Sequence, residues 1–153
     1  MTASNAQPRI LLPGEIQQLR NEVLWPHKSF ENCILETDRL STTFHFGIQV
    51  EGLTVATVTL QQEKSHRLHH EKQYRLRAMA VREGYRGQGF GDAIVEAGLN
   101  HLRGLGVEVV WCDARVAALN FYRRLHFNEL EEEYEIPIIG MHRFMWKVLS
   151  SQV

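Results

Sequence analysis

The clearest periodic pattern of apolar and polar positions in the chain lies between residues 92 and 105. Polar side chains recur there at helical spacing, and the positions on the opposite face are apolar. Gly104 and Gly106 follow, and glycine is the residue that most often ends a helix. We therefore predict an amphipathic helix over this segment. Its polar stripe is Asp92, Glu96, Asn100 and Arg103, and its apolar face is Ile94, Val95, Gly98, Leu99, Leu102 and Leu105.

The segments on either side of this helix have the pattern of strands. Residues 74–81, YRLRAMAV, alternate in the manner of a strand, and residues 107–112, VEVVWC, form a short apolar run of the buried-strand type. Asp113 is expected to cap a helix over 114–125. Two final strands are expected at 127–136 and 141–149, joined by PIIG.

The N-terminal half predicts a helix followed by a hairpin. After a polar tail, residues 14–25 place apolar side chains at i, i+3 and i+7, and Pro26 ends the pattern. Residues 44–60 hold two strand-like runs separated by Glu51-Gly52, which is a hairpin signal. Residues 61–72 are polar and read as a connection. This order of elements predicts an α/β domain on a mixed sheet, with a central strand-helix-strand crossover.

Composition narrows the class of protein. A chain of 153 residues, 44% hydrophobic, is expected to form one domain, 1–153. Its net charge of -1 provides no global field for nucleic acid or anionic lipid, and the arginines near the predicted loop lack an aromatic stacking platform. Two cysteines without metal-type spacing, a start without a signal-peptide pattern, and no apolar run of about 20 residues lead us to expect a cytoplasmic protein with neither a membrane nor a nucleic-acid partner. The arginines are Arg75, Arg77, Arg82 and Arg86, and the cysteines are Cys33 and Cys112.

Three alternating glycines, Gly87, Gly89 and Gly91, stand between the strand 74–81 and the long helix. The amides at a helix start point outward and attract anions, and glycine lets phosphate oxygens approach them. A nucleotide P-loop is excluded because Asp92-Ala93 follows the last glycine in place of Lys-Ser/Thr. The spacing G-x-G-x-G also differs from the G-x-G-x-x-G of a dinucleotide fold. A ligand-free tight connection explains the glycines equally well.

Two motifs in the expected order carry a resemblance to a known family. RGQGFG, with Arg86, Gly89 and Gly91, resembles the Arg/Gln-x-x-Gly-x-Gly/Ala loop of the GNAT acyltransferase superfamily. ALNFYRRLHF, residues 118–127, resembles its second signature, Ala-x-x-Phe-Tyr-x-x-x-Gly-Phe. The resemblance covers about residues 74–149 and is most similar to the small bacterial ElaA-like branch, judged on RLRAMAV, WCDAR and GMHRFMWKVL.

The resemblance implies an α/β (α+β) fold with a mixed, mostly antiparallel sheet flanked by helices. It also implies an N-acetyltransferase that moves acetyl from acetyl coenzyme A directly to a primary amine, with no metal. Tyr122 matches the tyrosine that protonates the leaving sulfur, and amides near Met79 and Ala80 match those that face the thioester oxygen. The implied coenzyme-binding residues are Met79, Ala80, Val81, Arg86, Gly87, Gln88, Gly89, Phe90, Gly91 and Asn120.

Several points stay open at this stage. Arg75 stands near the position where some relatives carry a glutamate base, and His126 replaces the glycine of the second signature. Cys112 as a nucleophile and the segment HRLHHE as a zinc site are both disfavoured, because neither has a suitably spaced partner group. The alternative function is a non-catalytic acyl-CoA-binding sensor or partner module. The acceptor amine and the choice between monomer and homodimer also stay open. Candidates for the general base are Glu71, His69, His70, Glu83, His142 or a water chain.

Overall fold

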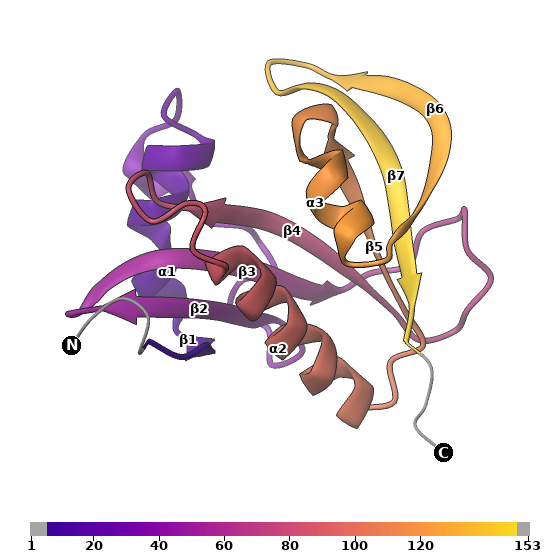
Figure 1. The fold of residues 1–153 in the computed structure, drawn as a ribbon, viewed down its shortest axis with the longest axis horizontal. Coiled ribbons are helices and arrows are strands. Elements are labelled where there is room, and N and C mark those ends of the chain that lie inside the picture. Colours follow the sequence, from indigo (N-terminus) through magenta and orange to yellow (C-terminus); the bar gives the residue numbers. More distant parts are fainter. Residues whose placement is uncertain (1–5, 150–153) are drawn as a thin grey trace. The chain divides into compact units, whose positions relative to one another are not determined.

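A computed structural model describes residues 6–149 (Figure 1). By its internal contacts the chain divides into two units. The first comprises the residues up to Gln62 together with Leu76–His101, and the second comprises Glu63–Arg75 and the residues from Leu102 onward. Strand β4 (Gln73–Val81) and helix α2 (Phe90–Gly104) each contribute residues to both units.

The strands of the first unit follow the order β1-β2-β3-β4. Strand β1 (Arg9–Leu11) pairs antiparallel with β2 (Phe44–Val50), which pairs antiparallel with β3 (Leu53–Gln62). The predicted hairpin is confirmed. Glu51 and Gly52 both have positive φ, at 50° and 82°, as a tight two-residue turn between twisted strands requires.

Strand β1 corrects the expectation of a polar tail before the first helix. Three residues are too few to show a periodicity, so tertiary contact rather than local pattern defines this strand. Leu11 is buried. A Cβ on Gly47, the glycine of β2, would lie 2.5 Å from the Leu11 Cδ1 atom. The glycine therefore makes room for the β1 side chain.

The helices of the first unit form where the sequence predicts them, and their apolar side chains are buried. Helix α1 (Pro13–Leu19) continues into a π-helical turn (Arg20–Leu24), in agreement with the predicted helix over 14–25, and a 3-10 turn follows at Phe30–Asn32. Ile16 and Leu19 are fully buried. Helix α2 confirms the predicted long helix, and its Gly98 lies where a Cβ would come within 2.6 Å of the Leu60 side chain.

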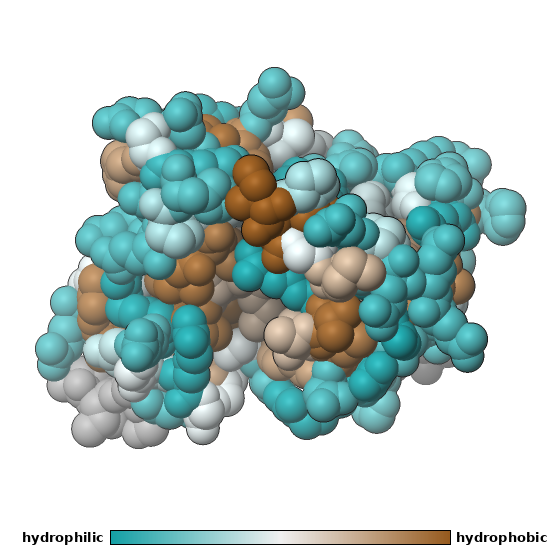
Figure 2. All heavy atoms as spheres, turned by 90° about the horizontal axis from the view of Figure 1, so that it is seen from above, coloured by the Kyte–Doolittle hydropathy of each residue, from teal (hydrophilic) through white to brown (hydrophobic). Residues whose placement is uncertain are grey.

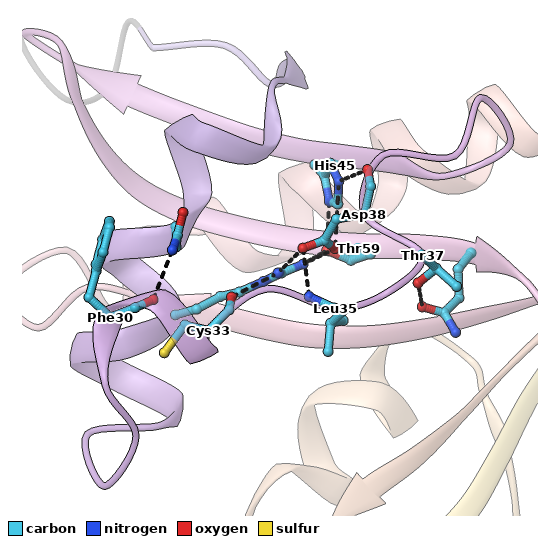
Figure 3. Close-up of polar contacts among 10 residues, drawn as sticks. Phe30, Cys33, Leu35, Thr37, Asp38, His45 and Thr59 are labelled. Atoms are coloured by element: carbon cyan, nitrogen blue, oxygen red, sulfur yellow. Dashed lines mark hydrogen bonds and ion pairs between the residues drawn. The ribbon is translucent and has the colours of Figure 1, made fainter.

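A buried polar cluster stabilises the connection between α1 and the hairpin (Figure 3). The Arg20 guanidinium, 1% exposed, donates to both Asp38 carboxylate oxygens at 2.6 and 2.9 Å. Arg20 also donates to the Thr59 hydroxyl at 2.8 Å, and that hydroxyl lies 2.9 Å from Nδ1 of His45. A buried charge is tolerated only when it is paired and hydrogen-bonded, and both terminal nitrogens of the Arg20 guanidinium meet that requirement, whereas its Nε is buried without a hydrogen-bond partner among the described residues.

The strands of the second unit follow the order β4-β5-β7-β6. The first residues of β4 pair parallel with β5 (Val109–Arg115), which pairs antiparallel with β7 (Gly140–Val148), and β7 pairs antiparallel with β6 (Asn128–Ile136). The two predicted C-terminal strands and the strand-helix-strand crossover are therefore confirmed. Four antiparallel pairings and this single parallel one are described, which is the expected mixed, mostly antiparallel sheet.

The structure corrects the predicted helix over 114–125. Strand β5 runs on to Arg115, so Asp113 lies inside a strand and caps no helix. A 3-10 turn (Val116–Ala118) and helix α3 (Leu119–Arg124) follow. Pairing of β5 with β7 supplies backbone hydrogen bonds through Arg115, and these outweigh the local signal of an aspartate before a helical pattern.

Leu105 is a second correction. The apolar pattern places it on the buried face of the long helix, but α2 ends at Gly104 and Leu105 is 53% exposed. Gly106 takes a φ of +79°, and its N–H donates to Arg103 while that of Val107 donates to Leu102. This is the Schellman arrangement, in which a glycine with positive φ closes the helix.

Polar side chains cover most of the face seen in Figure 2, and apolar groups show through at several places. Exposed apolar side chains include Leu12, Leu40 and Ile138. Scattered exposure of this kind is normal for a folded protein. Within residues 6–149, no helix is long and apolar enough to cross a membrane.

Candidate active site

The glycine loop joins the end of β4 to the start of α2 in the first unit. Gly87 and Gly89 have φ values of +77° and +82°, and a Cβ at either would have no heavy atom within 4 Å. The first amides of a helix lack acceptors within it, and the 15-residue helix α2 adds its dipole at this end. The backbone conformation and the open space around both glycines thus fit a bound diphosphate.

The remaining side chains of the loop hold its shape. Arg86 is exposed, and its Nε donates to the carbonyl of Val81 at 3.0 Å, while Gln88 donates to the carbonyl of Gly84 at 3.3 Å. The Phe90 ring is buried and stacks on Tyr85 at a centroid distance of 6.3 Å. Phe90 therefore packs inside the first unit.

The strand before the loop has an irregular backbone at Ala78, which has a φ of +53°. A non-glycine residue in this region is uncommon, and inside a strand it turns the following peptides out of the regular ladder. Met79, Ala80 and Val81 follow directly, and they are the residues expected to face the acyl donor. Strained backbone of this sort often marks functional positions.

Tyr122 lies on α3 in the second unit, 6% exposed, with its ring edge-on to Phe121 and Phe127 at 5.0 and 5.3 Å between centroids. Burial, together with neighbouring Cys112, holds the pKa of the Tyr122 phenol well above its ordinary value of 10.0. The phenol is therefore protonated across the physiological range. Asn120, expected to contact the coenzyme, is exposed and accepts a hydrogen bond from Arg123 at 2.9 Å.

Cys112 has the surroundings of a structural residue. It is 2% exposed, and burial, with a smaller contribution from Asp113, raises the pKa of its thiol far above the ordinary value. A thiol in that state supplies almost no thiolate, which is the reactive form. This agrees with the view of Cys112 as a small buried residue rather than a nucleophile.

The five candidate bases differ sharply in their surroundings. Glu71 is exposed and pairs with Lys64 at 2.9 Å, and this hydrogen bond lowers the pKa of the Glu71 carboxyl. Its neighbours His69 and His70, like Glu71, line an open hollow of about 540 Å³. These three residues precede β4 in the chain, whereas the glycine loop follows the end of β4. Glu83 is exposed. Only His142, among these five residues, is buried.

Sequence reasoning missed the cluster around Asp113. Its carboxylate accepts a hydrogen bond from Arg75 at 2.9 Å and another from the Tyr134 hydroxyl. Burial and this carboxylate raise the pKa of Tyr134 far above its ordinary value, so its hydroxyl stays a donor. The sequence does contain a signal for the pair of Asp113 and Arg75. Asp113 follows an apolar strand-like run, and Arg75 lies on the strand expected beside it.

Comparison with known proteins identifies the family to which this chain belongs. Residues 14–127 match the model of the acetyltransferase (GNAT) family. The chain belongs to the GNAT family. Consistent with this, it is 35% identical over 134 residues to an uncharacterized N-acetyltransferase of Bacillus subtilis (strain 168), YitI, covering 88% of this chain and 90% of that protein. It is thus an acyl-CoA-dependent GNAT enzyme that transfers acetyl from acetyl-CoA to an amine.

Solved structures show the same GNAT fold. Escherichia coli ElaA superimposes with a TM-score of 0.74 at 20% identity, covering 93% of this chain and 99% of that one. The ribosomal-protein-S18-alanine N-acetyltransferase of Escherichia coli gives a TM-score of 0.75 at 20% identity, covering 97% and 96%. The resemblance to the GNAT superfamily, inferred from the two motifs, is confirmed by the family match, and ElaA is among the proteins that share the fold.

Proposed function

We propose that this GNAT enzyme acetylates a primary amine by direct attack on acetyl-CoA, with the loop 86–91 and the strand 79–81 binding the coenzyme and Tyr122 acting as general acid. The observation that carries the proposal is the pair of left-handed glycines, Gly87 and Gly89, at the start of α2. Acetyl-CoA supplies the activated thioester. Every other element of the chemistry comes from residues of this chain.

The loop amides bind the diphosphate. Open space at both glycines lets phosphate oxygens reach backbone N–H groups, and the positive end of the α2 dipole favours their charge. The exposed Arg86 adds a full positive charge at the same turn. Gln88, Phe90 and Gly91 shape the loop around these donors, and Asn120 is proposed to contact the pantetheine arm.

The amides of Met79 and Ala80 are proposed to stabilise the negative charge that develops on the thioester oxygen. Donors already aimed at such a charge lower the barrier without reorganising during the reaction. The left-handed Ala78 immediately before them supports this assignment, because backbone in this conformation often marks functional positions. Val81 completes the segment, and its carbonyl anchors the Arg86 side chain.

Tyr122 is proposed to give its proton to the sulfur as the C–S bond breaks. Its buried phenol is protonated, as a donor must be. An ordinary thiol has a pKa of about 8.5, below that of the phenol, so transfer is favourable only in concert with bond breaking. The attacking amine loses one N–H proton, which replaces in the overall balance the proton that Tyr122 gives to the sulfur. The products are an amide and the free thiol of coenzyme A.

Two finer points belong to the same proposal. Cys33 and Cys112 are both free and buried, which supports a reducing, cytoplasmic compartment. The enzyme acts without metal or nucleic acid, as a monomer or homodimer. A cytoplasmic GNAT enzyme of this size would draw its acceptor from small amines or from peptide and protein amines.

Calorimetric titration with acetyl-CoA tests the coenzyme site. Wild-type protein should bind with a Kd in the micromolar range, and Gly89→Glu should abolish binding because its side chain and charge occupy the anion site and it strains a φ of +82°. Gly14→Glu is the matched control: a Cβ at Gly14 meets no heavy atom within 4 Å. Failure of the wild-type protein to bind would overturn the proposal.

The same titration separates the enzyme from a sensor. Tyr122→Phe should bind acetyl-CoA with unchanged affinity, but its turnover should fall by about 100-fold or more when proton donation is lost. Unchanged turnover would remove Tyr122 from the mechanism. Binding without turnover in the wild-type protein, across a broad amine panel, would favour the acyl-CoA-binding module.

A further inference from the structure

Arg82 is the first residue after β4 and begins the connection that carries the glycine loop. Its backbone N–H donates to the carbonyl of Val55 on β3 at 2.7 Å, and its Nε donates to the carbonyl of Thr54 at 3.2 Å. The guanidinium also forms an ion pair with Glu22, which belongs to the π-helical turn after α1. Arg82 therefore joins the start of the connection to two other elements of the first unit.

The carboxylate of Glu22 is oriented from two sides. One of its oxygens accepts a hydrogen bond from Arg82, and the other accepts one from the side chain of Gln18 at 3.0 Å. The backbone of this turn has the π-helical pattern, because the N–H of Trp25 donates to the carbonyl of Arg20 at 2.9 Å. Single π-helical turns are rare and are often found at functional sites. The carboxylate is therefore held in one orientation toward Arg82.

The same turn is anchored in the interior of the first unit by Arg20. Its guanidinium forms the buried ion pair with Asp38 and donates to the Thr59 hydroxyl (Figure 3). Moving the turn would break these contacts, and a buried charge that loses its partner is strongly destabilising. Glu22, two residues after Arg20, therefore has a rigid backbone support.

The glycines of the connection have little packing to fix them. A Cβ at Gly84, Gly87 or Gly89 would meet no heavy atom within 4 Å, and all three residues have positive φ. Glycine also loses more conformational freedom on ordering than any other residue. The position of the loop amides therefore depends on the contacts at the two ends of the connection.

Arg82 provides the contact at the first end. Its carbonyl accepts the N–H of Tyr85 at 3.0 Å, which closes a turn, and the ring of Tyr85 stacks on Phe90 at the start of α2. A series of contacts within the first unit thus leads from Glu22 through Arg82 to the residues on both sides of the glycines. Without the ion pair, the loop amides beyond this turn would lose their fixed starting point.

We propose that Arg82, held by Glu22, is a positioning residue of the coenzyme site, which keeps the loop 86–91 in the conformation that binds the diphosphate. The inference rests on the proposed function above and assigns the site a support that lies outside both sequence motifs. Arg82 acts through the loop backbone, because its guanidinium is engaged by Glu22 and the Thr54 carbonyl.

A different role for Arg82 would give the opposite result at Glu22. A guanidinium that bound phosphate directly would be released when Glu22 lost its charge, and the affinity for the coenzyme would rise. A guanidinium that positions the loop needs its carboxylate partner, so the affinity would fall. The effect of a substitution at Glu22 therefore distinguishes positioning from direct contact.

Calorimetric titration with acetyl-CoA measures this effect in the intact chain. Glu22→Gln and Arg82→Gln should each raise the Kd by about 10-fold, because a loop that is no longer anchored must be ordered on binding. The double variant should lose no more affinity than Arg82→Gln alone, since the two side chains act as a unit. Arg82→Lys keeps a cation beside Glu22 and should restore most of the affinity.

Glu15→Gln is the matched control. Glu15 lies on α1 and pairs with Arg9 at 3.5 Å, so the substitution removes the same charge from an arginine pair of the same unit. Its Kd for acetyl-CoA should equal that of the wild-type protein. Exposed ion pairs contribute little to folding, and Glu22 is 43% exposed, so Glu22→Gln should melt close to the wild-type temperature without coenzyme. If Glu22→Gln fails to fold, Glu22→Asp is titrated in its place.

The outcomes separate this inference from the proposed function. A Kd for Glu22→Gln equal to or below the wild-type value would overturn the positioning role, while the coenzyme site would stand. Additive losses in the double variant, or an equal loss in Glu15→Gln, would also overturn it, because the effect would then not belong to the pair. Failure of the wild-type protein to bind acetyl-CoA would overturn the proposed function and the inference with it.

Discussion

At the scale of single residues, the buried cluster of the first unit depends on one protonation state. His45 Nε2 lies 3.0 Å from the carbonyl of Asp38, so Nε2 carries the hydrogen and Nδ1 accepts from Thr59. Burial lowers the pKa of His45 below its ordinary 6.5, despite the opposing influence of Asp38. Burial acts to raise the pKa of Asp38, but hydrogen bonds from Arg20 and the Leu35 amide outweigh it and lower that pKa below 3.8.

These shifts predict the pH dependence of folding. Because unfolded His45 binds a proton more readily than folded His45, its contribution is fully present above pH 6.5 and is lost as the pH falls toward the folded-state pKa. The contribution of Asp38 is lost only in more acidic solution, below pH 3.8. Urea unfolding of wild-type protein should therefore show stability falling as the pH drops from 7 to 5, with a flatter profile for His45→Gln. Parallel profiles would contradict this.

At the scale of elements, two helices end in the same way with different residues. Helix α2 closes through Gly106, whereas α3 closes through His126, which has a φ of +67°. The N–H groups of His126 and Phe127 donate to the carbonyls of Arg123 and Tyr122, so α3 also has a Schellman ending. His126 therefore takes the conformation of the glycine that it replaces in the second GNAT signature, and the turn is kept at the cost of strain.

Substitutions at the two helix ends should change the free energy of unfolding in opposite directions. His126→Gly should raise the free energy of unfolding by up to about 1 kcal/mol, because it relieves a left-handed residue with a Cβ. Gly106→Ala should lower it by about 1 kcal/mol, since its φ of +79° disfavours any side chain, although the space is open apart from Lys72 Nζ at 3.7 Å. Denaturant unfolding of both variants measures this, and a loss of stability in His126→Gly would be the contrary result.

At the scale of the whole molecule, the proposed chemistry draws on both units of the chain. The residues proposed to bind the coenzyme belong to the first unit, apart from Asn120. Tyr122 belongs to the second. That the whole chain forms one domain stays a prediction. Binding of acetyl-CoA to the folded protein alone links this chemistry to global stability by mass action.

Acetyl-CoA should therefore raise the melting temperature of the protein. At a concentration of about 100 times Kd, a ligand that binds only the folded state stabilises it by about 2.7 kcal/mol. Thermal unfolding of wild-type protein should shift upward with acetyl-CoA, whereas Gly89→Glu should not respond. An equal shift in both proteins would show that the coenzyme binds elsewhere than at the glycine loop.

The sequence alone was sufficient for the features that depend on neighbouring residues. Helical spacing predicted α2, Glu51-Gly52 predicted the hairpin, and two short motifs predicted the GNAT family. Local signals work here because periodicity, turn conformation and a glycine-rich helix start act over a few residues. The assignment of Tyr122 came from the same motifs and stays a prediction.

Only the tertiary structure decided the features that depend on strand register. Pairing with β7 kept Asp113 inside β5 and brought it to Arg75 and Tyr134, although the local pattern favoured a helix cap. The pairing of Arg20 with Asp38 arose in the same way. These contacts join distant segments, and their energies come from burial and hydrogen bonding that no local pattern records.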